Sequence, residues 1–436
     1  MVEIALLAIA VLVLTLTLGV PLPYCFGSAL MVMYFVGDVT MRGMMLWGFQ
    51  QLSNPVLLAI PLFVLAGTIM SESGIAGSLL RFVNAFIGHI RGGLGVVAAV
   101  SCAVIGAISG SGLTGIAAIG PLLIPEMEKR GYPRAYATAL IANSSILGLL
   151  IPPSVTMIIF GWVTDTSILA CFLATLVPGL LIMTSFSILN LWMSRKFDLI
   201  LDETPTFKGL SREVGRRGVH AFPALLMPII ILGGIYGGVM TPTEAAAVAV
   251  IYSVPVGFLI YKGLKLPNFI AAGKEAATAV GAIMMMILFS MILSQMFVYE
   301  SIPQHMVEGI FSITENRVVL LILINILLFL VGMVVNDATS IILLGPLLLP
   351  LMEAIGVSPV QFAAIMGVNT AMGGVTPPYA SILYLGARIG NVKVTKVIPW
   401  AMKLILFGYV PVVFLTSFWS DVSLFLPRLF GYEIGP

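Results

Sequence analysis

Charged residues are scarce in this chain. Of 436 residues only 9% are Asp, Glu, Lys or Arg, whereas 59% are hydrophobic, and the mean hydropathy is +1.10. Soluble domains carry about 25% charged residues, and a water-facing surface of this composition would expose apolar patches that soluble monomers avoid. The scarcity of charge therefore excludes a soluble globule and predicts a protein embedded in the lipid bilayer, with no nucleic-acid partner.

Cysteine and histidine are equally rare. The three cysteines, Cys25, Cys102 and Cys171, are odd in number, far apart and inside apolar runs. We interpret them as packing thiols without a disulfide or a zinc site.

The three histidines lie near charged segments, so none is available as a base for a serine nucleophile such as Ser109 deep inside an apolar run. An intramembrane serine protease is therefore disfavoured. Gly273-Lys274 lacks the rest of a phosphate-binding loop, which excludes an ATP-driven pump. We expect no enzymatic activity and no organic cofactor.

Long apolar runs fill most of the chain. Each membrane crossing needs roughly 20 apolar residues, so this length allows about ten spans. The first run, 2–20, has no Lys or Arg ahead of it and no small-residue cleavage site after it. We expect it to be a retained first span and not a cleaved signal peptide.

The basic residues are concentrated in a few segments. The 195–217 segment alone holds six of the 21 Lys and Arg residues, so the positive-inside rule predicts that it is cytoplasmic. Alternating outward from it, with 93–125 and 318–352 as re-entrant hairpins, places most other Lys and Arg inside and both termini outside. Two full crossings in place of each hairpin would give the same alternation, so charge leaves that choice open.

The two halves of the sequence repeat each other. Gly120-Pro121-Leu122-Leu123 recurs 225 positions later as Gly345-Pro346-Leu347-Leu348, and Pro152-Pro153 recurs at the same offset as Pro377-Pro378. The charge pattern places 126–136 inside and 352–359 outside, which predicts copies of inverted orientation. Inverted repeats with matching Gly- and Pro-broken apolar segments are typical of secondary transporters and indicate where they bind substrate.

Each repeat contains a polar interruption inside a long apolar run. In the first it is Ser109–Thr114, and in the second it is Val335–Thr339. Freed backbone groups must be paired or line a wet cavity in the membrane, so we expect two hairpin tips near the midplane. Small-residue helix packing is the alternative interpretation of the first tip. Asp337 is the only carboxylate well inside an apolar run, and a coupling cation or a proton would offset its cost.

Each repeat also contains an apolar stretch that consecutive prolines interrupt. The polar and glycine residues before the prolines are Asn143-Ser144-Ser145 with Gly148, and Asn369-Thr370 with Gly373-Gly374. Prolines remove amide donors, so each stretch is predicted to unwind there and not merely to kink. The two half-helix ends would then attract a cation and an anion respectively. Hydroxyl, amide and carbonyl oxygens suit a hard monovalent cation, so we expect Na⁺ as the only metal ion.

These motifs resemble those of a known family. Residues 60–67, 106–125, 149–154, 335–350 and 373–378 are similar to the large membrane subunit of tripartite ATP-independent periplasmic (TRAP) transporters, the DctM/SiaM type. The resemblance covers essentially the whole chain. It implies an all-α elevator-type transporter of the bacterial inner membrane, with both termini periplasmic, that takes up an organic acid together with Na⁺.

The resemblance also implies partners. A periplasmic substrate-binding protein would deliver the substrate, a C4-dicarboxylate or sialic acid, and a small four-helix membrane subunit would be a separate chain. The alternative is a Na⁺/solute symporter of the same superfamily that works without a binding protein.

The implied Na⁺ sites are one per repeat. The first comprises Ser109, Gly110, Ser111, Asn143, Ser144 and Gly148, and the second comprises Asn336, Asp337, Thr339, Asn369, Thr370 and Gly373. No Arg inside a span offers a carboxylate clamp. We therefore expect the substrate to meet hydroxyls and helix N-termini near Thr114, Ser154, Thr156, Tyr379 and Ser381.

The predicted domain division follows the same motifs. It comprises N-terminal scaffold spans and an arm (1–92), a first repeat core (93–194, with hairpin 93–127, broken helix 136–165 and a following span), a cytoplasmic connecting loop (195–220), second-half scaffold spans and an arm (221–316), a second repeat core (317–390, with hairpin 317–352 and broken helix 360–389), and a last span with a periplasmic C-terminus (391–436).

Overall fold

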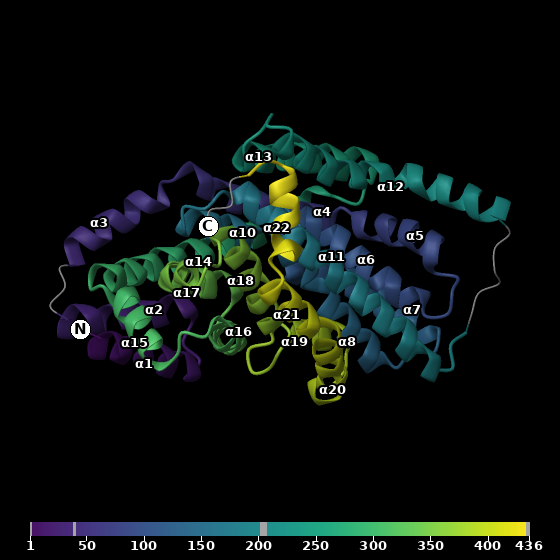
Figure 1. Cartoon of the computed structure of the whole chain (residues 1–436). Coiled ribbons are helices and arrows are strands. Elements are labelled where there is room, and N and C mark those ends of the chain that lie inside the picture. The colour runs from purple at the N-terminus through teal and green to yellow at the C-terminus, as the bar shows by residue number, and fades with distance from the viewer. Residues whose placement is uncertain (1, 38–40, 201–206, 433–436) are drawn as a thin grey trace.

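The computed structural model describes residues 2–37, 41–200 and 207–432, and all regular structure in these ranges is helical (Figure 1). Within them eight helices are long and apolar enough to cross a membrane, or up to nine if a pair bent by 41°, Arg134–Leu150 and Val155–Val163, forms one span. Large apolar side chains such as Phe35 and Ile251 stay exposed on the outside, where lipid would cover them. The chain is a polytopic all-α membrane protein, as its composition predicts.

A group of N-terminal helices precedes the first repeat core. They are α1 (Val2–Thr17), α2 (Leu22–Gly37), α3 (Met41–Leu52), the short η1 (Pro55–Leu58), α4 (Ala59–Glu72) and α5 (Ile75–Ile87). Asn54 starts η1 because its side chain accepts a hydrogen bond from the Val56 amide and Pro55 needs no such partner. α1 packs on α2, and α4 packs on the later helices α13 and α14.

The first repeat core follows. It consists of α6 (Gly93–Ser109), α7 (Gly112–Lys129), α8 (Arg134–Ser145), α9 (Leu147–Leu150), α10 (Val155–Val163), α11 (Ile168–Met193) and η2 (Ser194–Lys196). α6 lies along α7 and α8. α8, α9 and α10 form the broken helix, because the chain loses helical geometry at Pro152-Pro153.

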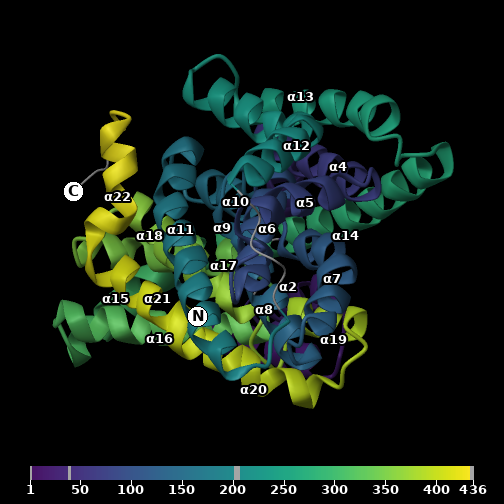
Figure 2. The ribbon, with the colours of Figure 1, turned by 90° about the vertical axis from the view of Figure 1, so that its right-hand side faces the viewer.

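Another group of helices connects the two cores along the chain. They are α12 (Phe207–Tyr236), α13 (Pro242–Pro255), η3 (Val256–Ile260), α14 (Leu266–Tyr299) and α15 (Ile302–Ile313). Thr241 and Glu244 cap the start of α13 reciprocally, with Pro242 at the first helical position. In both views α12 and α13 run along the top of the molecule, opposite α20 (Figures 1 and 2).

The second repeat core and the C-terminal helices complete the fold. They are α16 (Arg317–Val334), α17 (Asp337–Ala354), α18 (Pro359–Gly373), α19 (Ser381–Ile389), α20 (Val394–Leu404), η4 (Ile405–Tyr409), α21 (Val410–Phe418) and α22 (Ser420–Leu429). α18 and α19 form the second broken helix around Pro377-Pro378, and both Pro-Pro bonds are cis.

The helices confirm the internal repeat. α17 begins at Asp337, 225 residues after α7 begins at Gly112, and α18 begins at Pro359, 225 residues after α8 begins at Arg134. The packing is reciprocal as well: α10 of the first core packs on α17 of the second, and α19 of the second packs on α7 of the first. Such exchanged contacts are what a two-fold relation between similar units produces.

Two helices begin earlier than their apolar runs. α12 begins at Phe207, so residues 207–220, which were expected to belong to a connecting loop, are helical. α14 begins at Leu266 and therefore includes Lys274 and Glu275, which precede its apolar run. No proline interrupts 207–222, and the charged side chains of Arg216, Lys274 and Glu275 are exposed. A helix can therefore continue past the apolar boundary, which the charge pattern alone does not reveal.

Candidate functional site

The two hairpin tips and the two broken helices surround one central cavity of about 280 Å³. Its wall includes residues from both repeats and from two scaffold helices, α4 and α14. The lining residues are Val64, Gly110, Ser111, Gly112, Leu113, Leu149, Val155, Thr156, Ala279, Ile283, Asn336, Asp337, Ala338, Thr370, Gly374, Tyr379, Ser381 and Ile382. The structure thus brings together segments that are more than 200 residues apart in sequence.

Four helices begin at this cavity. The first-turn residues that line it are Gly112 and Leu113 of α7, Val155 and Thr156 of α10, Asp337 and Ala338 of α17, and Ser381 and Ile382 of α19. The first amides of a helix lack intrahelical partners and carry partial positive charge. Helix N-termini are therefore anion sites, and here four of them share one cavity.

The first hairpin tip is held against the first broken helix by close backbone packing. α6 ends at Ser109, Gly110 turns the chain at φ 62°, and Ser111 is extended before α7. A Cβ on Gly106 would lie 2.2 Å from the Gly148 Cα, so no larger residue fits there without movement. Gly110 and Ser111 line the cavity. Ser109 lies behind it, and its hydroxyl donates to the Ile105 carbonyl over 3.1 Å.

Asn143 and Ser144 of the first broken helix are buried polar residues behind the cavity wall. Asn143 Nδ2 donates to the Ala139 carbonyl over 2.9 Å. Asn143 Oδ1 and Ser144 Oγ have no hydrogen-bond partner within the described part of the chain. An unpaired buried polar group costs about 1–3 kcal/mol. Both atoms are oxygens that accept, so a cation placed here would satisfy them.

The second hairpin tip presents Asp337 to the cavity. Asn336 caps α17 by accepting a hydrogen bond from the Thr339 amide over 2.9 Å. The Thr339 hydroxyl and the Asn336 amide both donate to the sulfur of Met286 on α14. Asp337 is partly accessible from the cavity, which no Lys or Arg lines, and its carboxylate forms no ion pair within the ranges described. Its negative charge therefore has no protein counter-ion.

The second broken helix repeats the pattern of the first. Asn369 Nδ2 donates to Asn325 Oδ1 over 2.7 Å and to the Ile365 carbonyl over 2.8 Å, while Asn369 Oδ1 lacks a partner among the described residues. At the 225-residue offset Asn369 corresponds to Ser144, whose hydroxyl is also unpaired. Thr370 lines the cavity, and its hydroxyl donates to the Met366 carbonyl. Gly373 packs directly on the backbone of Gly332 of the second hairpin.

The substrate candidates divide into three groups. Thr156, Tyr379 and Ser381 line the cavity. Ser154 lies one layer behind, where its hydroxyl donates to the Leu149 carbonyl over 2.6 Å and meets the Thr156 hydroxyl at 2.7 Å. Thr114 lies apart, in a small cavity between the first hairpin and α4 and α5.

Two contributors, Asn325 and Met286, are not predicted from the sequence. Asn325 accepts hydrogen bonds from both Asn369 and Ser417, which links α16, α18 and α21 inside the protein. Its signal was available, because Asn325 is a single polar residue within the apolar run 318–334. Met286 resembles any other apolar residue of a lipid-facing helix, so no pattern distinguishes it.

The fold and the cavity define a class: a polytopic membrane protein whose two repeats enclose a central cavity, the architecture that secondary transporters share. The family model for the tripartite ATP-independent periplasmic transporter, DctM component, matches residues 9–420. The chain therefore belongs to the DctM family of TRAP transporter membrane components, as the resemblance of its motifs predicts.

Named relatives agree with this assignment. The chain is 32% identical to the C4-dicarboxylate TRAP transporter large permease protein DctM of Pseudomonas aeruginosa, over 93% of each chain. It is 34% identical to the sialic acid TRAP transporter large permease protein SiaM of Vibrio cholerae, over 87% of this chain and 88% of that one. It is 32% identical to the isethionate TRAP transporter permease protein DctMQ of Oleidesulfovibrio alaskensis, of whose length it spans 61%.

One solved structure shares the fold. The YdaH transporter of Alcanivorax borkumensis superposes with a TM-score of 0.56 over 89% of each chain, at 17% sequence identity. This likeness concerns the fold alone.

Proposed function

We propose that this chain is the large membrane component of a system that takes up an organic acid with Na⁺ across the bacterial inner membrane. The observation that carries the proposal is the convergence of four helix N-termini on one cavity, whose described lining residues include no Lys or Arg. Such a cavity attracts an anion through backbone dipoles, which neutralise less charge than an arginine clamp and allow easier release. A transporter must bind its substrate and also let it go.

The coupling ion is inferred from the unpaired oxygens behind the cavity. Asn143 and Ser144 in the first core, and Asn369 in the second, each present a buried oxygen that lacks a donor within the described ranges. We place one Na⁺ site in each core: Ser109–Ser111 with Asn143, Ser144 and Gly148, and Asn336, Asp337 and Thr339 with Asn369, Thr370 and Gly373. Two bound cations would add positive charge beside the helix N-termini and so strengthen anion binding.

The substrate class follows from the cavity and from the relatives. C4-dicarboxylates, sialic acid and isethionate, for which relatives are named, are organic anions at neutral pH. Ectoine, for which a relative from Halomonas elongata is named, also carries a carboxylate. We propose that the substrate's acidic group lies at the N-termini of α7, α10, α17 and α19, with Thr156, Tyr379 and Ser381 contacting the rest of the molecule.

The proposed partners are those of a tripartite system. A periplasmic substrate-binding protein hands over the substrate, and a small four-helix membrane subunit assembles with this chain. In the proposed elevator mechanism the two hairpins and broken helices move as one body against the scaffold. The contacts of Asn336 and Thr339 with Met286 on α14 are then among those that movement would break.

Reconstitution tests the proposal. The chain, its small subunit and its binding protein are placed in proteoliposomes without ATP, and uptake is measured with an inward Na⁺ gradient or with K⁺ on both sides. We expect uptake only with Na⁺ and the binding protein. Equal uptake in K⁺ would reject the coupling. Full uptake without the binding protein would support the second candidate, a self-sufficient Na⁺/solute symporter.

A further inference from the structure

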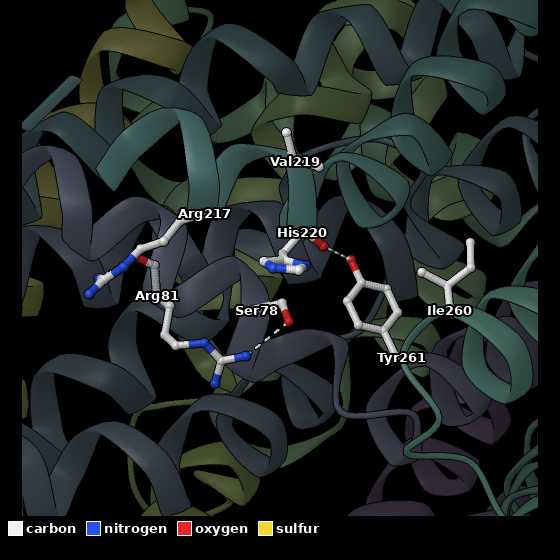
Figure 3. Close-up of a pocket in the computed structure, with 7 residues that line it drawn as sticks. All are labelled: Ser78, Arg81, Arg217, Val219, His220, Ile260 and Tyr261. Atoms are coloured by element: carbon white, nitrogen blue, oxygen red, sulfur yellow. Dashed lines mark hydrogen bonds between the residues drawn. The ribbon is translucent and has the colours of Figure 1, made fainter. Parts of the chain in front are cut away.

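A second cavity, of about 500 Å³, lies away from the central site, between α5, α12 and the end of η3. Its lining residues are Ser78 and Arg81 of α5, Arg217, Val219 and His220 of α12, Ile260 of η3, and Tyr261. Figure 3 shows the Arg81 guanidinium next to Ser78, with His220 and Tyr261 close by. Among the described residues, the lining includes Arg81 and Arg217 and no carboxylate.

Arg81 is available to bind a ligand. A guanidinium has five N–H donors in a planar fork, and here Nη2 donates to Ser78 Oγ over 3.1 Å. Arg81 forms no ion pair with a carboxylate of the described residues. The Arg81 side chain is exposed, so its remaining donors are accessible to a ligand.

Arg217 and Tyr261 hold the cavity in shape. Arg217 Nη2 pairs with Glu213 at 2.5 Å, and its Nη1 donates to the Arg81 carbonyl over 3.0 Å, which ties α12 to α5. The Tyr261 hydroxyl donates to the His220 carbonyl over 2.7 Å and so ties the end of η3 to α12 (Figure 3). The His220 ring adds at least one N–H donor in any protonation state.

The cavity lies at the boundary between the charged and the apolar part of α12. α12 carries Glu213, Arg216 and Arg217 before this level and has no Asp, Glu, Lys or Arg from Val219 to its end. Exposed apolar side chains flank the cavity: Val219 is 73% exposed, Leu259 70% and Ile260 54%. This arrangement offers donors to an anionic head and an apolar surface to an attached tail.

We propose that the cavity formed by Arg81, Arg217 and His220 binds a phosphate group, carried by an anionic phospholipid or by a soluble phosphate compound. The planar donors of arginine match phosphate oxygens in pairs. Basic pockets between spans at the cytoplasmic level bind phospholipid head groups, and the charge pattern predicts that 195–217 lies on that side. The site is independent of the transport cavity and of its proposed substrate.

Arg81→Gln is the diagnostic variant, and Arg216→Gln is its matched control. Arg216 neighbours Arg217 on α12, is exposed and does not line the cavity. Delipidated full-length protein is titrated with phosphatidylglycerol or phosphatidylcholine and read by native mass spectrometry. The wild type and Arg216→Gln should bind phosphatidylglycerol about tenfold more tightly than Arg81→Gln does, which is the loss expected for one charge-assisted contact. Phosphatidylcholine should bind all three weakly.

A second arm identifies the source of the phosphate. Sodium phosphate, with sodium sulfate at equal ionic strength as the reference, is added while the melting temperature is followed. Stabilisation of the wild type but not of Arg81→Gln indicates a soluble phosphate, and a response to phosphatidylglycerol alone indicates a lipid. If Arg81→Gln does not fold, Arg81→Lys replaces it and should also weaken binding. Equal phosphatidylglycerol and phosphate responses in the wild type and the Arg81 variant, or equal losses in the Arg81 and Arg216 variants, would overturn the proposal.

Discussion

Asp337 is the residue on which the ion chemistry depends most. It occupies the first position of α17 and faces the central cavity, and no Lys or Arg is among the described residues that line this cavity. The helix N-terminus stabilises its carboxylate in part, and a bound Na⁺ would supply the remaining positive charge. These features favour a role for Asp337 as an ion ligand over a role in packing.

Replacing Asp337 by Asn tests this role, because the shape is kept and the charge is lost. A charge-assisted contact contributes about 1.5–3 kcal/mol, so the Na⁺ concentration for half-maximal uptake should rise about tenfold or more. Ser111→Ala, at the equivalent tip, should give a milder defect. Uptake is measured against Na⁺ concentration in proteoliposomes.

Glu353→Gln is the matched control, since Glu353 lies near the end of the same helix with an exposed side chain. It should leave the Na⁺ dependence unchanged. If Asp337→Asn behaves like Glu353→Gln, Asp337 has a structural role and the ion site is elsewhere.

At the scale of single residues, the sequence predicts site residues where polar side chains interrupt apolar runs. Ser111, Asn336 and Asp337 break hydrophobic stretches and do lie around one cavity. Asn325 also interrupts an apolar run, and its position is as unusual as theirs. Met286 could not be found, because its contact with Thr339 arises only when α14 packs on α17.

Among the elements, the first hairpin depends on a close approach between two glycines. Gly106 of α6 and Gly148 of α9 touch through their backbones, which brings the tip against the unwound helix. A Cβ at Gly106 would overlap the Gly148 Cα, and neither atom belongs to a flexible side chain. The hairpin would have to move away from the broken helix.

Gly106→Ala should therefore reduce uptake strongly and destabilise the protein by about 1–3 kcal/mol, the usual cost of overpacking. Gly281→Ala is the matched control, because nothing lies within 4 Å of a Cβ added at this position of α14. Melting temperature and uptake are measured on both variants. If Gly106→Ala, like the control, left both the melting temperature and uptake unchanged, the hairpin tip would not need this contact.

The order of the elements was predictable because proline and glycine mark their breaks. The repeat of Gly-Pro and Pro-Pro at one offset is matched by the starts of α7 and α17 and of α8 and α18. The starts of α12 and α14 were not predictable in the same way. Exposed charged residues do not end a helix. A prediction that begins each helix only after the last charged residue therefore places the starts of α12 and α14 too late in the sequence.

At the scale of the whole molecule, we expect the two halves to have opposite orientation in the membrane. The helices show that the halves correspond and exchange contacts reciprocally. The charge pattern predicts Lys129 on the cytoplasmic side and Glu353, with both termini, on the periplasmic side.

Single-cysteine labelling tests the orientation. Cysteines at positions 129 and 353 are introduced one at a time after the buried native cysteines are replaced, and an impermeant maleimide is applied to intact cells and to inverted vesicles. We expect position 353 to react in cells and position 129 in inverted vesicles. Labelling of both positions from the same side would contradict the inverted arrangement.

The central claim is that an organic acid and Na⁺ cross together through one cavity, and direct sodium flux is its sharpest test. Radioactive Na⁺ and labelled substrate are followed in the same reconstituted proteoliposomes with the partner subunit and the binding protein. We expect substrate addition to drive Na⁺ entry in a fixed ratio, and the omission of either solute to stop the entry of the other. Substrate accumulation with no accompanying Na⁺ movement would contradict this claim.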